Sequence, residues 1–237
     1  FGADQFYCPC NSWERIKTWF AGGSHQFTTG TNASFAYRRH TDLFVLYRNR
    51  PGQFTNRHAL ESWQGALRQS AALNSNTRLH YGGEFYHDAI QSNNLGSRSR
   101  SRGALYASLD ARALNRFSFT AGAREEYFGA GRAQFIPSVG GGVWLGARTK
   151  VAASASRAFR IPTFTELYYR DPFSRGNAGL APEEAWGYEG SLQFYPATHW
   201  RTGVTVFHRD EKNVIDWPSQ PTPATSSSST SLAWKPL

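Results

Sequence analysis

The chain has 237 residues, of which 26 are Lys or Arg and 17 are Asp or Glu, so its formal net charge is +9. The basic residues are spread singly and form one dense group, Arg98, Arg100 and Arg102, which we expect at a loop tip; this pattern favours a solvated or anionic surface over a nucleic-acid interface. No apolar run is long enough for a membrane helix, and Cys8 and Cys10 are too few for a disulfide framework.

The predicted elements are strands, because apolar and polar residues alternate with a period of two. The first expected strand covers residues 14–21 and the last covers residues 201–209. The apolar members of the strands between them are, in chain order, Ala33, Phe35 and Tyr37; Leu43, Val45 and Tyr47; Trp63 and Leu67; Leu79, Tyr81 and Phe85; Leu105, Ala107 and Leu109; Phe117, Phe119, Ala121 and Ala123; Val139, Val143 and Leu145; Val151, Ala153 and Ala155; and Trp186, Tyr188, Leu192 and Phe194. This indicates about ten strands of about nine to thirteen residues, a length that crosses a bilayer at a tilt.

The predicted connections alternate between short and long. Short turns are expected at residues 22–30, 72–77, 111–116, 146–150 and 196–198, and longer polar segments at residues 48–57, 88–102, 128–134 and 159–183. An up-and-down meander has this pattern when the connections at one rim are short and those at the other rim are long. We call the rim with the long connections the elaborated rim. The strands of soluble sandwiches are shorter, with about five or six residues.

The two faces of the predicted strands differ in a way that a soluble core does not explain. One face carries Ala, Val, Leu and Gly in mid-strand and aromatic residues toward the ends, as a lipid-facing surface with an aromatic girdle would. The other face carries charged and hydroxyl side chains, among them Arg124 and Glu126, and requires a wet or polar interior. Only a closed barrel pairs every backbone polar group in lipid. The fold class is therefore predicted to be all-β, an antiparallel up-and-down transmembrane β-barrel with about ten strands of a larger barrel present.

One long connection also carries a familiar motif. It reads Ala158-Phe159-Arg160-Ile161-Pro162-Thr163-Phe164-Thr165-Glu166-Leu167-Tyr168 and is followed by Gly176, Asn177, Leu180, Pro182 and Glu183. This combined spacing resembles the late-barrel signature of TonB-dependent outer-membrane receptors, and the vitamin B12 and siderophore branch is the most similar. Ala178 departs from the pattern, because the family usually has proline after Gly-Asn.

The resemblance implies an outer-membrane receptor that imports a metal chelate, either a cobalamin or a ferric siderophore. It also implies contact with outer-membrane lipid and with TonB through a plug domain, and no cofactor. Two alternatives stay open: a passive outer-membrane porin, and a secreted β-rich carbohydrate-binding or adhesin domain. The chain shows no catalytic motif and no metal-ligand motif, so we expect neither an enzyme nor a metal site.

The candidate ligand-binding residues lie in the same long connection. They are Tyr168, Tyr169, Arg170, Asp171, Phe173 and Arg175. External aromatic and basic side chains are suited to contact a chelate, but a loop packed on itself explains them equally well. The sequence leaves both readings open.

The chain is expected to divide into a barrel part, residues 1–217, and a Pro/Ser/Thr-rich tail outside the barrel, residues 218–237. It contains no methionine. We therefore interpret it as a part of a longer protein, in which a plug and a TonB box would precede Phe1 and further strands would follow.

Overall fold

The computed structural model describes residues 11–129, 131–170, 174–216, 232–233 and 235–236, and its main feature is one ten-stranded antiparallel sheet. Each strand of this sheet pairs with its neighbours in chain order. The strands are β1 (Trp13–Thr28), β2 (Thr31–Val45), β3 (Thr55–Asn74), β4 (Thr77–Ser92), β5 (Gly96–Ala113), β6 (Phe117–Phe128), β7 (Arg132–Trp144), β8 (Thr149–Arg160), β10 (Glu183–Ala197) and β11 (Trp200–Lys212). The predicted all-β, up-and-down architecture is confirmed.

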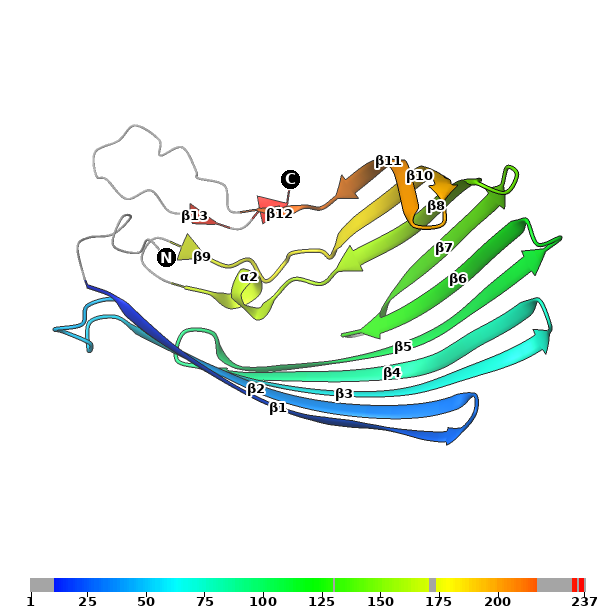
Figure 1. Ribbon diagram of the computed structural model, residues 1–237. Coiled ribbons are helices and arrows are strands. Elements are labelled where there is room, and N and C mark those ends of the chain that lie inside the picture. Colours follow the sequence, from blue (N-terminus) through cyan, green and yellow to red (C-terminus); the bar gives the residue numbers. More distant parts are fainter. Residues whose placement is uncertain (1–10, 130, 171–173, 217–231, 234, 237) are drawn as a thin grey trace.

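The sheet is curved into an open trough (Figure 1). The strands β1 to β5 form one wall, and β6, β7, β8, β10 and β11 turn upward to form the other. The single helix of the described residues, α2 (Phe164–Tyr168), lies on the concave side with the short strand β9 (Ser174–Arg175) nearby. Within the described part of the chain, no helix has the length and apolar character that crossing a membrane requires.

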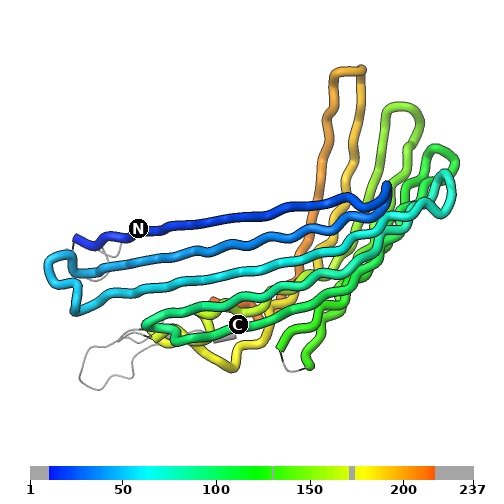
Figure 2. The backbone as a smooth tube through the Cα atoms, turned by 90° about the horizontal axis from the view of Figure 1, so that it is seen from below, coloured from blue at the N-terminus to red at the C-terminus, as the bar shows by residue number. Residues whose placement is uncertain are grey.

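Six of the ten strands, β1 to β5 and β10, are longer than the sequence predicted, whereas β6, β7, β8 and β11 have the predicted length. The ten strands have 12 to 20 residues, and the longest, β3, has 20. The tube in Figure 2 shows that β1 to β5 reach well beyond the ends of the shorter strands that follow them, β6 to β8. In those six strands, the prediction of about nine to thirteen residues ended the strand where its apolar alternation ended, whereas the backbone pairing continues through polar residues.

Three predicted connections are wrong because strand pairing continues through residues that the sequence presented as loops. The segment 88–102 is no long loop, because β4 and β5 pair up to Ser92 and Gly96 and only three residues join them. Arg98, Arg100 and Arg102 therefore lie in β5 and not at a loop tip. The segment 128–134 is also no long loop, because β6 runs to Phe128 and β7 begins at Arg132, with positive φ at Gly129 and Gly131. The segment 22–30 lies mostly in β1, which ends at Thr28.

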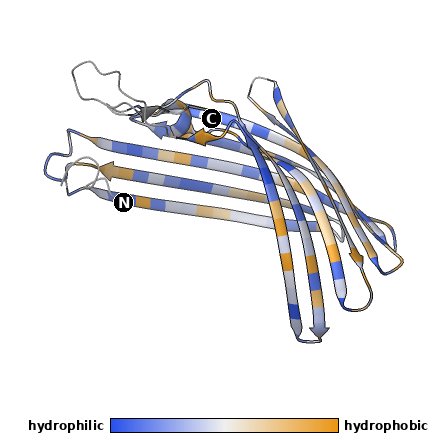
Figure 3. Cartoon of the chain, turned by 90° about the horizontal axis from the view of Figure 1, so that it is seen from above, coloured by the Kyte–Doolittle hydropathy of each residue, from blue (hydrophilic) through white to orange (hydrophobic). Residues whose placement is uncertain are grey.

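The outward face of the sheet is apolar and unusually exposed. Figure 3 shows hydrophobic residues spaced along the strands between polar ones. Leu105, Val204 and Val206 are 63%, 66% and 68% exposed, and the sheet register places the predicted apolar residues on this common face. A soluble domain does not leave so many large apolar side chains uncovered. The face fits a lipid environment, as the alternation predicted.

The concave face is polar and held by ion pairs. Arg124 Nη1 lies 2.7 Å from Glu84 Oε2, and its Nη2 lies 2.9 Å from Glu126 Oε2. Arg102 Nη1 lies 3.0 Å from Glu126 Oε1, and Tyr86 donates a 2.7 Å hydrogen bond to Glu84. Three strands, β4, β5 and β6, contribute to this network. Charged groups that are half-buried and mutually paired in this way give the interior a wet, polar wall.

The sheet splits at one place near the elaborated rim. β6 and β7 pair over 12 residue pairs, but β7 and β8 pair over only seven and stop at Ser138 and Ser156. Beyond that point, Arg157 of β8 donates hydrogen bonds to the backbone oxygen of Phe135 and to Gln134 Oε1. A side chain thus takes the place of the missing part of the ladder.

The described ends of the chain add two small sheets. β12 (Ile215–Asp216) pairs with β14 (Lys235–Pro236), and β9 pairs in parallel with β13 (Leu232–Ala233). Most of the predicted tail lies outside the described residues.

Candidate functional site

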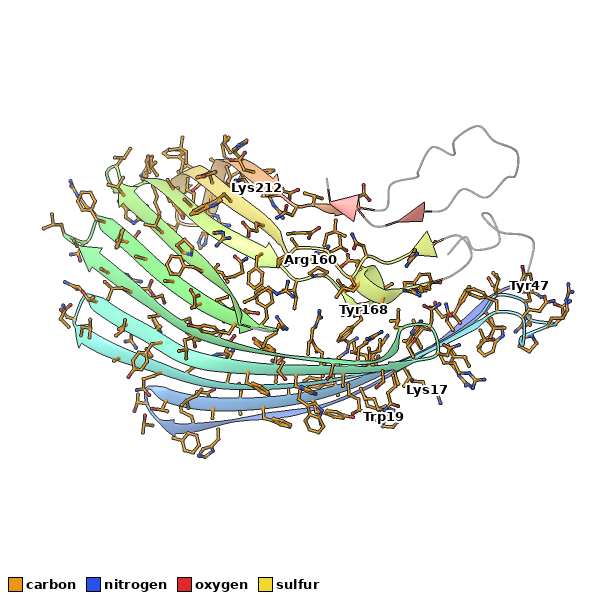
Figure 4. The ribbon with its side chains drawn as sticks, turned by 180° about the vertical axis from the view of Figure 1, so that it is seen from behind. Lys17, Trp19, Tyr47, Arg160, Tyr168 and Lys212 are labelled. Carbon is orange, nitrogen blue, oxygen red and sulfur yellow. The ribbon has the colours of Figure 1, made fainter. Side chains whose placement is uncertain are left out.

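The connection between β8 and β10, residues 161–182, folds into the trough and forms the candidate site together with the opposite wall (Figures 1 and 4). Pro162 restricts the preceding residue to extended geometry. Thr163 then caps α2: its hydroxyl accepts from the Glu166 backbone at 3.2 Å, and Glu166 Oε2 accepts from the Thr163 backbone at 2.6 Å. This capping box defines a short helix within a segment that the sequence presented as a loop.

Arginines of β5 hold this helix against the wall. The Arg100 guanidinium lies 4.6 Å from the centre of the Phe164 ring, and its Nη1 donates a 2.7 Å hydrogen bond to the Pro162 carbonyl. The Arg98 guanidinium lies 4.3 Å from the centre of the Tyr168 ring. Cation–π contacts of this kind are stronger when they are partly shielded from water. Arg98 and Arg100, two members of the dense arginine group, therefore anchor the loop.

An apolar cluster lies beneath the same helix. Phe164 packs with Ile90 and Leu95, and all three are buried. Leu60, Tyr168 and Tyr169 surround them. This small core joins β3, β4 and the β4–β5 turn to a segment about seventy residues later in the chain.

The start and end of the loop are tied together by a carboxylate–arginine set. Arg160 Nη1 lies 3.0 Å from Glu166 Oε2, and Arg160 Nε also contacts Glu183 Oε2. Glu183 Oε1 accepts a 2.7 Å hydrogen bond from the backbone of Ile215. Burial alone would raise the pKa of Glu166, but hydrogen bonds from Arg160 and Thr163 outweigh it and hold the pKa below its ordinary value. Glu166 is thus an ionised structural group.

The remaining motif residues shape the return path of the chain. A Cβ on Gly176 would lie 2.8 Å from the Glu166 carbonyl oxygen, so only glycine fits against α2. Asn177 donates its backbone N–H to that same oxygen at 2.8 Å and accepts from the Gly179 backbone at 2.9 Å through its side chain. Leu180 is buried, and the Pro182 carbonyl accepts a hydrogen bond from Asn213. Phe159 stacks on Phe128 with ring centres 5.6 Å apart.

The candidate ligand residues contact the opposite wall. Asn56 Nδ2 lies 3.3 Å from the Tyr169 hydroxyl, and the backbone of Arg170 exchanges two hydrogen bonds with the Asn94 side chain, at 2.9 and 2.6 Å. The loop is therefore packed on the β3–β5 wall and not only on itself. Asp171 and Phe173 lie outside the described residues.

An open pocket of about 760 Å³ lies between this loop and the β4–β5 turn. Its described lining includes three arginines and no acidic residue: Asn93, Asn94, Leu95, Gly96, Arg98, Leu167, Tyr168, Arg170, Arg175, Gly176, Asn177 and Ala178. Guanidinium and amide groups around a concave surface are suited to bind an anion with several oxygen atoms. The sequence predicted Tyr168, Arg170 and Arg175 here but missed Arg98, Asn93 and Asn94. The Arg–Ser alternation was the available signal, because it places alternate arginines on one face of a strand.

The described side chains of the site do not form a metal centre. Within the described ranges, no three His, Cys, Asp or Glu side chains lie together as metal ligands would. The pocket offers cations and amides, which bind and orient an anion.

Comparison with known proteins places this geometry in a context. The family described as TonB dependent receptor-like, beta-barrel, matches residues 3–232. None of the curated proteins matches the chain.

Solved structures with the same fold are distant in sequence. The siderophore receptor PirA from Pseudomonas aeruginosa is 18% identical with a TM-score of 0.73, and the match covers 95% of this chain and 42% of that one. The Serratia marcescens hemophore receptor HasR, a double mutant in complex with its hemophore HasA and heme, is 14% identical with a TM-score of 0.80 over 95% and 44%. A mutant of the ferric enterobactin receptor PfeA from Pseudomonas aeruginosa is 16% identical with a TM-score of 0.72 over 95% and 39%. The chain thus spans less than half the length of these proteins.

Proposed function

Since the chain belongs to the family of TonB-dependent receptor β-barrels, which lie in the bacterial outer membrane, we propose that it forms one wall of a receptor that imports a metal chelate. The coarse assignment to uptake receptors follows from the family. The identity of the ligand is the part that we propose from the site. We further propose that residues 1–217 belong to the barrel and residues 218–237 to a tail outside it.

The ligand that suits the site best is a ferric siderophore with a net negative charge. The observation that carries this proposal is the pocket of about 760 Å³ in which Arg98, Arg170 and Arg175 meet with no acidic residue among the described lining. Oxygen-rich chelates that retain negative charge gain from guanidinium groups, which donate in pairs. A cobalamin, which lacks an excess of anionic oxygens, would gain less from three arginines. We therefore rank it second among the two chelates.

The expected partners are a plug domain and TonB. The polar network of Glu84, Arg124 and Glu126 on the concave wall supports a polar partner inside the barrel, because charged groups are costly against an apolar one. Energy for import would reach the barrel through that partner. The match to the receptor barrel family weighs against a passive porin, and the lining of the pocket supports a binding role.

The test is a binding titration on the complete receptor. The triple change Arg98→Gln, Arg170→Gln and Arg175→Gln should weaken binding of an anionic ferric siderophore at least tenfold, because each lost charge-assisted hydrogen bond contributes about 1.5–3 kcal/mol. Arg116→Gln, in the short turn at the opposite rim, is the matched control and should bind as the unchanged protein does. Unchanged affinity in the triple variant, with normal heat-modifiable migration on a gel, would reject this pocket as the site.

A further inference from the structure

The turn between β4 and β5 contacts the loop of residues 161–182 through one side-chain amide. Asn94 Oδ1 accepts a 2.9 Å hydrogen bond from the backbone N–H of Arg170, and Asn94 Nδ2 donates a 2.6 Å hydrogen bond to the Arg170 carbonyl. Two residues that exchange both bonds in an antiparallel ladder lie directly opposite each other. The amide of Asn94 therefore takes the place of a strand beside Arg170.

The other side of Arg170 is already paired within the loop. Arg170 forms an isolated antiparallel bridge with Arg175, in which the Gly176 N–H donates a 2.7 Å hydrogen bond to the Tyr169 carbonyl. In a bridge with this bonding pattern, the N–H and C=O of Arg170 point away from Arg175. These two backbone groups need a partner on that side, and Asn94 supplies it.

The turn that carries Asn94 is itself fixed to the sheet. The Ser92 hydroxyl accepts a 3.0 Å hydrogen bond from the backbone N–H of Asn94. The preceding residue, Asn93, makes the same kind of two-atom contact toward β3: it accepts from the Arg57 N–H at 2.7 Å and donates to the Thr55 carbonyl at 2.6 Å. The amide of Asn94 is thus a fixed point against which the loop docks.

This contact holds a charge that its neighbours repel. Arg170 lines the pocket together with Arg98 and Arg175, and like charges around one pocket repel each other. Arg98 is directed by a 3.2 Å hydrogen bond from its Nε to the Leu95 carbonyl. Arg170 is held through its backbone, by Asn94 on one side and by the bridge to Arg175 on the other.

We propose that Asn94 is a positioning residue of the ligand pocket. Its amide fixes the main chain of Arg170 before a ligand arrives, so that the three guanidinium groups share one concave surface in spite of their repulsion. A ligand that meets donors already in place does not have to order them, and its affinity is higher for that reason. The inference rests on the proposed function of the pocket, and it holds for any anionic chelate.

The first measurement needs no ligand. In the complete receptor, Asn94→Ala and Asn94→Leu each remove both hydrogen bonds, and leucine keeps nearly the size of asparagine. Hydrogen exchange of the Arg170 amide, read at single-residue resolution by mass spectrometry, should become roughly tenfold faster in both variants. The Leu167 amide, which donates to the Thr163 carbonyl within α2, should keep its exchange rate, because β5 still anchors the helix.

The second measurement is the affinity of the complete receptor for the ferric tris-catecholate complex, which is a polyanionic chelate. Asn94→Ala and Asn94→Leu should each weaken binding roughly tenfold. The matched control is Asn74→Ala, because the Asn74 side chain accepts a 2.9 Å hydrogen bond from the Asn76 backbone in the β3–β4 turn at the opposite rim. This control should bind as the unchanged receptor does, and heat-modifiable migration on a gel verifies that each variant is folded.

A double-mutant cycle separates positioning from a general effect on the loop. If Asn94 acts through the Arg170 guanidinium, Asn94→Leu should cost little further affinity once Arg170→Gln has removed that group. The two changes should then be strongly non-additive. A general loosening of the loop would instead weaken binding by the same factor in both backgrounds.

Three results would overturn the inference: full affinity in Asn94→Leu while the triple arginine variant loses affinity, losses in Asn94→Leu and Arg170→Gln that simply multiply, or an unchanged exchange rate at the Arg170 amide. A loss confined to Asn94→Ala would assign the residue a packing role. Normal binding by the triple arginine variant, with faster exchange at the Arg170 amide in the Asn94 variants, would reject the pocket itself. In that case the proposed function fails and the positioning role fails with it.

Discussion

The lipid-facing surface can be tested by placing one charge at a known depth. Val139 lies five residues before Trp144, the last residue of β7, which is roughly 13 Å along the membrane normal at about 3.4 Å per residue and a tilt of about 40°. Half of an apolar band about 25 Å tall is about the same distance. Val139, which is 47% exposed on the outward face, is therefore a midplane position, and Val139→Arg should cost about 2–4 kcal/mol.

Two further positions provide the controls. Val143 lies on the same face but only one residue before the end of β7, so Val143→Arg should cost about 0–1 kcal/mol. Ser118 lies on the concave face, where its hydroxyl donates to the Gly142 carbonyl, and an arginine there stays in a wet interior. The assay is a denaturant titration of the complete receptor in lipid vesicles, followed by tryptophan fluorescence. Equal costs at the three positions would refute a depth-dependent lipid face.

Four other outcomes are expected. Arg100→Gln removes the contacts of this guanidinium to α2, so limited proteolysis should cut residues 161–182 several-fold faster; an unchanged rate would show that the anchor lies elsewhere. The folded pKa of Glu166 is below its ordinary value, so its stabilisation of the loop is complete above the ordinary carboxyl pKa and is lost as pH falls through the folded value; loop protection from protease should fall with acid, and Glu166→Gln should remove that dependence. Deleting residues 168–175 should weaken chelate binding with barrel assembly intact, and full affinity in the deletion would exclude this segment. Residues 1–237 alone should aggregate, because β1 and β11 each leave an open edge of the sheet; a monodisperse chelate-binding monomer would contradict this.

The sequence predicted the membrane-embedded part of the fold well, because lipid imposes a strict alternation. Leu105, Leu109 and Val139 were assigned to the lipid face, and the register confirms it. The depth of each residue was beyond reach, since apolar periodicity does not mark where the membrane begins. Val143 would have been taken for the midplane, and only the position of the β7–β8 turn shows that Val139 is there.

The parts of the strands outside the membrane were the ones that the sequence missed. In the segment from Ser97 to Arg102 both faces are polar, so hydrophobic periodicity is absent and a loop was the natural interpretation. The strand forms because its arginines find partners more than sixty residues away, on α2 and at Pro162. Such long-range pairing leaves no local signal. The motif residues were recognised from family resemblance, but their roles as caps and clamps required coordinates.

The split between β7 and β8 has a mechanical consequence for the rim. A strand ladder yields only when several backbone bonds break together, whereas the Arg157 bridge consists of single side-chain hydrogen bonds that water can replace one at a time. The outer end of β8 leads into the loop with α2. It is joined to β7 there by the side-chain hydrogen bonds of Arg157 and not by a backbone ladder. We expect this part of the wall to separate more easily than the stretch below it, where β7 and β8 pair over seven residues.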